Sequence, residues 1–354
     1  MAANVRRCVV LSNGIVGAEK QALALASALG LPYRVEPAIR FDKSPLWSLP
    51  TPALLAGVHA GAMNAWLPTW RPPHPEVAIS CGRGSIPASV QLRSASRGRT
   101  VTIHVQKPAC DERLFDLVVA PRHDYSAAEQ PSNVILTDGS LHGVTNEALS
   151  SARDEWASEF RELPGPRLSV LIGGQVSRRW WQQPLAPTVS GRFSGELLES
   201  ALQALRQEGS GSLLVTASRR TPDEALARVR DELKRAKEVF PEVVTRMWTP
   251  DGSSNPYMGL LAWSDYILVT ADSINMVTEA CGSGKPVYVA SPHLCQRRFA
   301  SFHQAMIERG RTRSWPTDDG RLEPSSAWTL EPGCLGSNEA AARINELLDL
   351  RCAS

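Results

Sequence analysis

The segment that most constrains the fold of this chain is residues 266–290, YILVTADSINMVTEACGSGKPVYVA. It opens with an apolar, β-branched run that predicts a strand buried on both faces. Asp272 and Ser273 interrupt this run, and both residue types cap helices well. The apolar spacing from Ile274 to Ala280 then predicts a short helix, and the glycines and proline that follow end this helix before a second strand at 287–290.

A strand, a capped helix and a second strand form a βαβ unit, whose strands run parallel and are joined by a right-handed crossover. In sheets of this kind ligands bind at the carboxyl ends of the strands, beside helix N-termini that favour anions. The loop at Asp272 and Ser273 is therefore the first place where the sequence predicts a bound phosphate or diphosphate.

The length and charge of the chain limit its possible functions. The 354 residues suit two domains of ordinary size. Lys and Arg total 38 against 36 Asp and Glu, and this net charge of +2 gives no case for nucleic-acid binding by bulk electrostatics. No apolar run approaches the length of about 20 residues that a membrane-spanning helix needs, so no transmembrane segment is expected.

The N-terminal sequence MAANVRR leads directly into a predicted strand. We therefore expect neither a signal peptide nor a long transit segment, and a cytosolic site of action, with any attachment to a membrane surface made through a partner. The seven cysteines are scattered and none forms a CxxC pair. Reduced thiols are expected, with neither a disulfide framework nor a zinc site.

Strands alternate with helices along the whole chain, which predicts an α/β fold. Strands are predicted at residues 7–11, 32–35, 77–80, 100–105, 114–120, 134–137, 168–172, 213–216, 243–248, 266–270 and 287–290. Helices are predicted at residues 18–29, 87–94, 152–163, 194–207, 260–263, 297–309 and 338–350, and one more begins near Thr221. A Pro-Gly-Pro linker at 164–166 divides the chain into predicted domains at 1–163 and 167–336, followed by a C-terminal helix at 337–354.

Two glycine-containing turns in the first domain are candidates for anion binding. Gly14 and Gly17 lie in SNGIVG after the first strand, but this is not a complete GxGxxG motif, and a tight strand-to-helix turn is the preferred interpretation. Arg83 lies in CGRGS after the strand at 77–80 and has two open interpretations, a contact to an anion or a solvent-facing position in a simple turn.

Two histidine-containing clusters follow neighbouring predicted strands. His123 and Asp124 lie in PRHDY, and His142 lies in LTDGSLHG. Polar groups at adjacent strand ends are expected in a functional site, so these three residues are candidates for acid/base catalysis or for binding diphosphate and hydroxyl groups. The alternative for each histidine alone is that it caps a strand and satisfies loop backbone.

The second domain has its own polar strand ends. Gly173 and Gly174 follow the strand at 168–172 and resemble a phosphate-facing turn. Ser218, Arg219 and Arg220 follow the strand at 213–216 and place a hydroxyl and two cations at another strand end.

Tryptophans are concentrated in a proline-rich segment without clear periodicity. Trp47, Trp66 and Trp70 are expected to pack that segment onto the core, and the alternative is that they dock a partner or a membrane. The polar stretch that contains Trp180 and Trp181 is left unassigned.

Long and specific motifs identify a family. The sequences NPYMGLLAWSDYILVTADSINMVTEACGSGKPVYV, PRHDY, LTDGSLHG, LIGG and TASRRTP closely resemble the plant "elongated mitochondria" fission-factor family, which has bacterial relatives. The resemblance covers nearly the whole chain. It implies an α/β fold of the GT-B glycosyltransferase type, with two Rossmann-like parallel-sheet domains that face each other across a cleft.

The resemblance also implies roles for residues of the second domain. In GT-B enzymes this domain holds a sugar nucleotide, and Glu279 matches the acid that binds the ribose hydroxyls. Ser273, Ile274 and Asn275 match the diphosphate end of the same helix. No metal is required, because helix dipoles and basic side chains neutralise the diphosphate in such enzymes.

The glycine turns have counterparts as well. Gly173 and Gly174 match the glycine-rich turn of the nucleotide domain, and Gly14 and Gly17 match the loop on the acceptor side.

Two functions are therefore expected from the sequence. The first is a fission factor that helps to recruit a dynamin-related GTPase to the outer surface of mitochondria, works from the cytosol and requires no cofactor. The alternative is a glycosyltransferase that uses a nucleotide sugar, with Glu279, Ser273, Arg219, Arg220 and the His123–Asp124 pair at its site. A GT-B epimerase or hydrolase is a third possibility that product analysis distinguishes.

Overall fold

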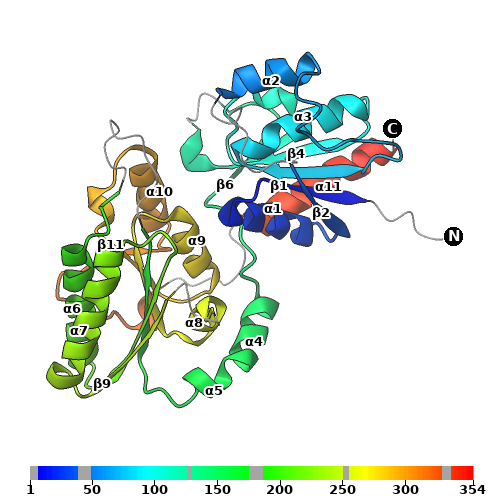
Figure 1. The fold of residues 1–354 in the computed structure, drawn as a ribbon. Coiled ribbons are helices and arrows are strands. Elements are labelled where there is room, and N and C mark those ends of the chain that lie inside the picture. Colours follow the sequence, from blue (N-terminus) through cyan, green and yellow to red (C-terminus); the bar gives the residue numbers. More distant parts are fainter. Residues whose placement is uncertain are drawn as a thin grey trace. The chain divides into compact units, whose positions relative to one another are not determined.

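The computed structural model describes residues 7–38, 49–125, 130–174, 186–249, 255–328 and 336–353. The chain forms two compact units (Figure 1). The first combines Met1–Gly143 with Leu335–Ser354, and the second is Val144–Cys334. Each unit contains one six-stranded parallel sheet. The α/β class and the two Rossmann-like parallel-sheet domains predicted from the sequence are confirmed.

The sheet of the first unit has the strand order β2-β1-β3-β4-β5-β6. Its strands are β1 Cys8–Ser12, β2 Tyr33–Pro37, β3 Val77–Cys81, β4 Val101–Val105, β5 Leu117–Pro121 and β6 Val134–Thr137. Every residue of β3, β4 and β5 is buried, as expected for central strands covered on both faces. The edge strand β2 is mostly exposed.

Helices cover both faces of this first sheet. They are α1 Val16–Ala28, α2 Thr51–His59, α3 Ile86–Ala95 and α11 Ser337–Ala353, with short 3-10 turns η2 Arg83–Ser85, η3 Glu112–Leu114 and η4 Arg122–Asp124. Alternate residues of β1 face opposite layers: Cys8 and Val10 pack with α1 and α11, whereas Val9 and Leu11 pack with α2 and α3. The sheet is thus the middle layer of an α/β/α arrangement.

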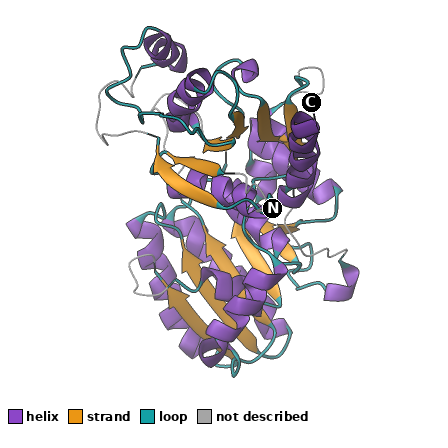
Figure 2. Cartoon of the chain, turned by 90° about the vertical axis from the view of Figure 1, so that its right-hand side faces the viewer, coloured by secondary structure: helices purple, strands orange, loops and turns teal. Residues whose placement is uncertain are grey.

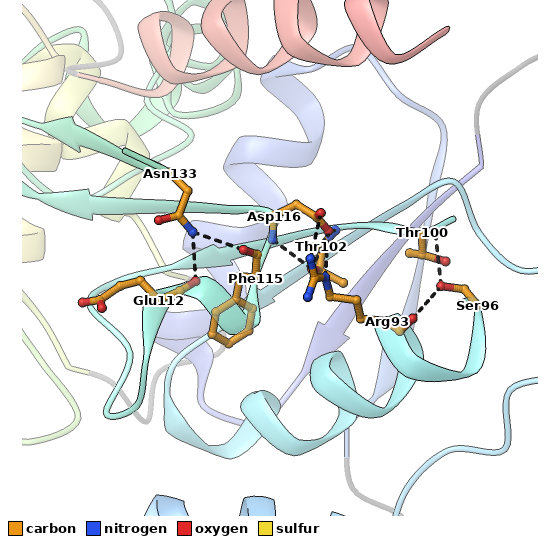
Figure 3. Close-up of polar contacts among 8 residues, drawn as sticks. All are labelled: Arg93, Ser96, Thr100, Thr102, Glu112, Phe115, Asp116 and Asn133. Carbon is orange, nitrogen blue, oxygen red and sulfur yellow. Dashed lines mark hydrogen bonds and ion pairs between the residues drawn. The ribbon is translucent and has the colours of Figure 1, made fainter. Parts of the chain in front are cut away.

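A polar cluster around Asp116 joins β4, β5 and α3 in the first unit (Figure 3). The Asp116 carboxylate accepts hydrogen bonds from the backbone amide and the hydroxyl of Thr102, each at 2.9 Å, and pairs with Arg93 at 3.3 Å. The Asn133 amide group donates to the carbonyls of Glu112 at 2.9 Å and Phe115 at 3.1 Å. These contacts satisfy backbone groups at the amino-terminal ends of the strands and leave the opposite edge of the sheet for polar loops.

The sheet of the second unit has the order β12-β11-β10-β7-β8-β9. Its strands are β7 Arg167–Ile172, β8 Gly211–Ala217, β9 Val243–Trp248, β10 Tyr266–Thr270, β11 Val287–Ala290 and β12 Arg313–Trp315. The chain builds outward from β7 through β8 to β9 and then returns to place β10 on the other side of β7. The strand order therefore reverses between β7 and β10, where sheets of this kind bind ligands.

Helices also flank the second sheet, as Figure 2 shows. They are α4 Asn146–Glu155, α5 Ala157–Phe160, α6 Gly191–Gln207, α7 Asp223–Val239, α8 Tyr257–Trp263, α9 Ile274–Gly282 and α10 Arg297–Glu308, with 3-10 turns η5 Pro292–Leu294 and η6 Ser325–Ala327. The core beneath α6 and α7 includes Leu198 and Val229 against Val170 and Val215.

The division into units differs from the predicted domain boundary at residue 163. The helices α4 and α5 belong to the second unit because Arg153 donates to the Ala262 carbonyl at 3.1 Å, and the Trp263 indole donates back to the Arg153 carbonyl at 3.0 Å. The C-terminal helix α11 belongs to the first unit, where Ile344 is buried with Leu25 of α1. A linker motif marks a turn in the chain but does not show which unit the adjacent helix packs on.

Three local elements also differ from prediction. The helix predicted at 152–163 begins earlier, because the Thr145 hydroxyl caps α4 by accepting from the Ala148 amide, and it breaks into α4 and α5. The helix α2 lies in the proline-rich segment where no periodicity was found, and it is held by buried Leu54. The three-residue strand β12 was missed. Trp66 and Trp70 pack on the core of the first unit, whereas Trp47, Trp180 and Trp181 lie outside the described residues.

Candidate functional site

The strand reversal in the second unit brings three predicted segments together. Gly173 and Gly174 follow β7, Asp272 and Ser273 follow β10, and the loop from Ser218 follows β8. Because these strands are adjacent and parallel, their carboxyl ends lie at one edge of the sheet. The three segments that the sequence singled out in this unit therefore meet at one edge of the sheet.

The glycine turn after β7 is hydrogen-bonded within the chain. The Gly173 amide donates to the Thr270 hydroxyl at 2.8 Å, and the Gly174 amide donates to Oδ2 of Asp272 at 2.7 Å. The Gly173 carbonyl accepts from the Thr221 hydroxyl at 2.5 Å. Asp272 thus supplies at Gly174 the negative oxygen that the sequence led us to expect from a phosphate.

Close packing explains why both positions are glycine. A Cβ atom at position 173 would overlap the Asp272 carboxylate, and one at position 174 would overlap the backbone carbonyl group of Arg220. Glycine is therefore required here by the approach of the chain's own β8 and β10 loops.

Asp272 is a buried acid, with 5% of its surface exposed. Burial raises the pKa of its carboxyl group above the ordinary value, and hydrogen bonds from Thr270 and Gly174 together with the charge of Arg220 oppose that rise. The Arg219 and Arg220 side chains are themselves exposed at the end of β8. The site therefore combines an internal carboxylate with two cations that reach solvent.

The loop after β8 is a compact turn. The Ser218 amide donates to the Ile172 carbonyl at 2.8 Å, and the Ser218 hydroxyl accepts from the Arg220 amide at 3.2 Å. The buried Thr221 hydroxyl contacts Ser218 at 3.2 Å. These hydrogen bonds fix the backbone conformation of the turn from which the Arg219 and Arg220 side chains extend.

Ser273 is the N-cap of α9, as the sequence predicted, and its hydroxyl accepts from the Met276 amide at 3.4 Å. Asn275 and Glu279 lie one helical turn apart and therefore on one face of α9. Both side chains are partly buried. A backbone amide in the first turn of α9 is therefore satisfied by the chain's own Ser273 hydroxyl.

Glu279 has a partner that the sequence did not predict. The Tyr257 phenol, on α8, donates to Oε2 of Glu279 at 2.6 Å. Burial, and then the negative charge of Glu279, raise the pKa of Tyr257 well above its ordinary value, so the phenol stays a donor at neutral pH. Tyr257 lies in the NPYMG motif, but nothing in the spacing of that motif indicates Glu279 as its partner.

In the first unit, His123 and Asp124 lie on η4, directly after β5. Nε2 of His123 lies 4.0 Å from Oδ1 of Asp124, and both side chains are largely buried. Lys107 donates to the Asp124 carbonyl at 3.1 Å and covers the Tyr125 ring at 4.3 Å. The structure therefore brings the predicted His123–Asp124 pair together.

His142 lies after β6 and is 2% exposed. Burial lowers the pKa of its ring to about 4, which keeps the imidazole neutral at physiological pH. Its backbone amide donates to the Ser337 hydroxyl at 3.3 Å and so ties this loop to the start of α11. The ion pair of Arg122 with Asp138 at 3.6 Å links the ends of β5 and β6, so the two histidine clusters do follow neighbouring strands.

The remaining candidates of the first unit have internal partners. Gly14 has a φ of +75°, and its amide donates to the Ser12 hydroxyl at 3.2 Å, as in the tight turn preferred from the sequence. Gly17 lies in the first turn of α1. Arg83 donates to the Thr51 hydroxyl at 3.2 Å and to the Leu49 carbonyl. Arg83 therefore anchors the start of α2, a role that neither predicted interpretation included.

Two general properties bear on the site. Within the described part of the chain, no helix is both long and apolar enough to span a bilayer. Among the side chains that the structure describes, no three or more His, Cys, Asp or Glu residues are grouped so that they could hold a metal ion.

Comparison with solved structures agrees with the fold. A UDP-glucosyltransferase from Polygonum tinctorium, solved in a complex with 3,4-dichloroaniline and described as capable of glucosylating indoxyl, superposes with a TM-score of 0.50 at 12% sequence identity. The match covers 98% of this chain and 90% of that enzyme. At this level of identity the likeness concerns the fold alone, which is GT-B-like.

Comparison of sequences identifies relatives along the chain. The family profile described as "Mitochondrial fission ELM1" matches residues 16–348. The mitochondrial fission protein ELM1 of Arabidopsis thaliana is 30% identical over 98% of this chain and 92% of its own length. An uncharacterized protein of Rickettsia prowazekii, RP120, is 23% identical over 62% of this chain and 65% of its own length. The chain therefore belongs to the mitochondrial fission ELM1 family.

Proposed function

We propose that this protein is a fission factor that works from the cytosol, attaches peripherally to the outer surface of mitochondria and helps to recruit a dynamin-related GTPase there. The observation that carries the proposal is the match to the Arabidopsis fission protein, which extends over 98% of this chain. A match of that extent includes both compact units, so both have counterparts in the plant protein.

The geometry of the second unit supports a scaffold function. At the strand reversal, Thr270 and Asp272 accept from the amides of Gly173 and Gly174, and Ser273 caps α9. These are groups that nucleotide-binding domains of this topology turn toward phosphates. Because they are hydrogen-bonded within the chain, the fold needs no anion at this edge to satisfy them.

The proposal is tested by complementation. This chain is expressed in Arabidopsis cells that lack the fission protein ELM1, and mitochondrial length and the fraction of dynamin-related protein on mitochondria are measured by microscopy. The proposal predicts shorter mitochondria and more dynamin-related protein on them than in cells with an empty vector. Elongated mitochondria with unchanged recruitment, at an expression level that matches the plant protein, would contradict it.

A second candidate function is a glycosyltransferase that uses a nucleotide sugar. The observation that favours it is the bond from the Tyr257 phenol to Glu279 at 2.6 Å. This bond fixes the orientation of a partly buried carboxylate on the helix that follows the strand reversal, which is where the family resemblance expects an acid that binds ribose.

The two functions are separated by one substitution. Glu279→Gln keeps the size of the side chain and removes the charge that would hold ribose hydroxyls. In the complementation assay a scaffold is expected to tolerate E279Q, whereas a transferase is expected to lose activity. Analysis of the products formed from UDP-glucose and ADP-glucose then distinguishes transfer from hydrolysis or epimerisation.

A further inference from the structure

The strand β2, Tyr33–Pro37, forms one edge of the sheet in the first unit (Figure 1). In the part of the chain that the structure describes, β2 pairs with β1 and with no other strand. Tyr33 is 42% exposed and Val35 is 45% exposed, which is high for large apolar residues in a strand. An open edge with exposed apolar side chains is a template for pairing with another strand.

The hydrogen bonds to β1 show which backbone groups face outward. The Cys8 amide donates to the Pro32 carbonyl at 3.2 Å, and the Ala38 amide donates to the Ser12 carbonyl at 2.7 Å. In a parallel ladder with this register, alternate residues of β2 bond to β1. The backbone amides and carbonyls of Arg34 and Glu36 therefore point toward β1. The amide and carbonyl of Tyr33 and Val35 therefore point to the open edge.

The side chains of β2 divide between the two faces of the sheet. Arg34 and Glu36 share one face, where Nε of Arg34 lies 3.3 Å from Oε1 of Glu36 and both side chains reach solvent. This face borders a hollow of about 490 Å³ whose lining includes Trp70 and Arg71. Tyr33 and Val35 share the other face. The strand thus carries one cation and one anion, placed symmetrically about Val35.

We propose that this edge binds a second copy of the same chain, with the two β2 strands antiparallel about a twofold axis that passes through Val35. In this register Val35 exchanges both outward backbone hydrogen bonds with Val35 of the second copy, and the Tyr33 amide donates to the Pro37 carbonyl. Arg34 of each copy then lies directly opposite Glu36 of the other. Such a non-hydrogen-bonded pair brings side chains closest, and opposite charges there are favourable.

The charges select this partner and this direction. A parallel pairing in register would place Arg34 of one copy beside Arg34 of the other, and Glu36 beside Glu36. Both are like-charge pairs, which are unfavourable. Pro37 has no amide hydrogen, so the paired segment ends there. A shift of one residue would place the apolar side chains of one copy and the charged side chains of the other on the same face. Only the antiparallel arrangement about Val35 satisfies the backbone groups and both charges together.

The test measures the mass of the full-length chain by sedimentation equilibrium over a concentration range up to about 100 µM, where weak specific dimers are populated. The wild type is expected to show a reversible monomer–dimer equilibrium. Arg34→Glu and Glu36→Arg each place two like-charge pairs in the interface, and each is expected to raise the dimer Kd at least about tenfold. The double variant R34E/E36R restores opposite charges and is expected to return the Kd to near the wild-type value.

One further variant tests the backbone pairing, and another serves as a control for the charge change. Val35→Pro removes the outward amide without touching the ladder to β1 and is expected to abolish the dimer, provided that circular dichroism shows an unchanged fold. Arg192→Glu makes the same charge change at an exposed ion pair on α6 and is expected to leave the dimer intact. A wild type that stays monomeric, or a dimer that survives both R34E and V35P, would overturn the proposal.

Discussion

The backbone amide of Gly174 donates a hydrogen bond of 2.7 Å to the carboxylate of Asp272, across the point where the strand order of the second sheet reverses. This contact places the chain's own negative charge at a glycine turn that the sequence predicted to face a phosphate. It also explains the two glycines, because side chains there would overlap Asp272 and the Arg220 backbone. The turn therefore joins β7 to the β8 and β10 loops.

The first prediction concerns Gly174. Gly174→Ala forces a Cβ atom against the carbonyl group of Arg220 and is expected to lower the free energy of unfolding by about 3 kcal/mol or more. Chemical denaturation followed by circular dichroism measures this change. The matched control is Gly143→Ala, at a position with open space around the added methyl group, which is expected to change stability by less than about 0.5 kcal/mol. Equal effects of the two substitutions would contradict the packing explanation.

The second prediction concerns the charge of Asp272. Its raised pKa means that the folded state holds the proton more tightly than the unfolded state, so its contribution to stability falls as the pH rises from the ordinary pKa of an aspartate to the raised value. Asp272→Asn keeps an oxygen acceptor for Gly174 and removes this dependence. Denaturation midpoints across that range should therefore fall with pH more steeply in the wild type than in D272N. The control Asp231→Asn makes the same substitution at an exposed position on α7.

The third prediction concerns His142. Its folded pKa of about 4 lies below the ordinary value of 6.5, so its contribution to stability is present above pH 6.5 and is lost as the pH falls through about 4. The loss is expected to be on the order of 1–3 kcal/mol and to be absent in His142→Gln. Titration of the histidine ring signals by NMR should show His142 neutral at pH 5.5. The control His293→Gln makes the same substitution at an exposed position on η5. A His142 ring that titrates near pH 6.5 would contradict this prediction.

The fourth prediction concerns the Tyr257–Glu279 pair. Tyr257→Phe removes the donor and leaves a partly buried carboxylate without that bond, so a loss of about 1–3 kcal/mol is expected. In the double variant Y257F/E279A the loss should be smaller than the sum of the two single losses, because each single change removes one partner of the shared contact. Tyr33→Phe, on the exposed strand β2, is the control that should be neutral. Additive losses would show that the two residues do not interact.

The sequence predicted most strands because they are short runs rich in apolar and β-branched residues, at the sheet edges as well as in the centre. β6, β9, β10 and β11 begin and end at the predicted residues, and the start of α9 at Ser273 follows from its capping side chain. The helix α2 was missed because its proline-rich segment lacks helical periodicity and is held by tertiary packing of Leu54. The assignment of α4 to the second unit depends on contacts of Arg153 with α8, which no local pattern encodes.

The segments that meet at the strand reversal were all named from the sequence, but the sequence could not identify what satisfies the glycine turn. An aspartate from a neighbouring loop and a bound phosphate both offer an anionic oxygen to the Gly174 amide, and both require glycine for close approach. Arg83 shows the same limit, because an arginine after a strand can pair with an anion or, as here, anchor α2 through Thr51. Tyr257 was found only from the structure, since its partner Glu279 lies 22 positions along the chain.

The measurement that tests the central claim most directly is a calorimetric titration of the wild-type protein with UDP, UDP-glucose and ADP-glucose at neutral pH, repeated with D272N. Because Asp272 already accepts from Gly174, we predict no binding to the wild type at ligand concentrations up to about 1 mM. Any binding free energy would then be weaker than about −4 kcal/mol, the value for a Kd of 1 mM. Binding to the wild type in the micromolar range, lost in E279Q and unchanged in D272N, would contradict the account and favour the glycosyltransferase.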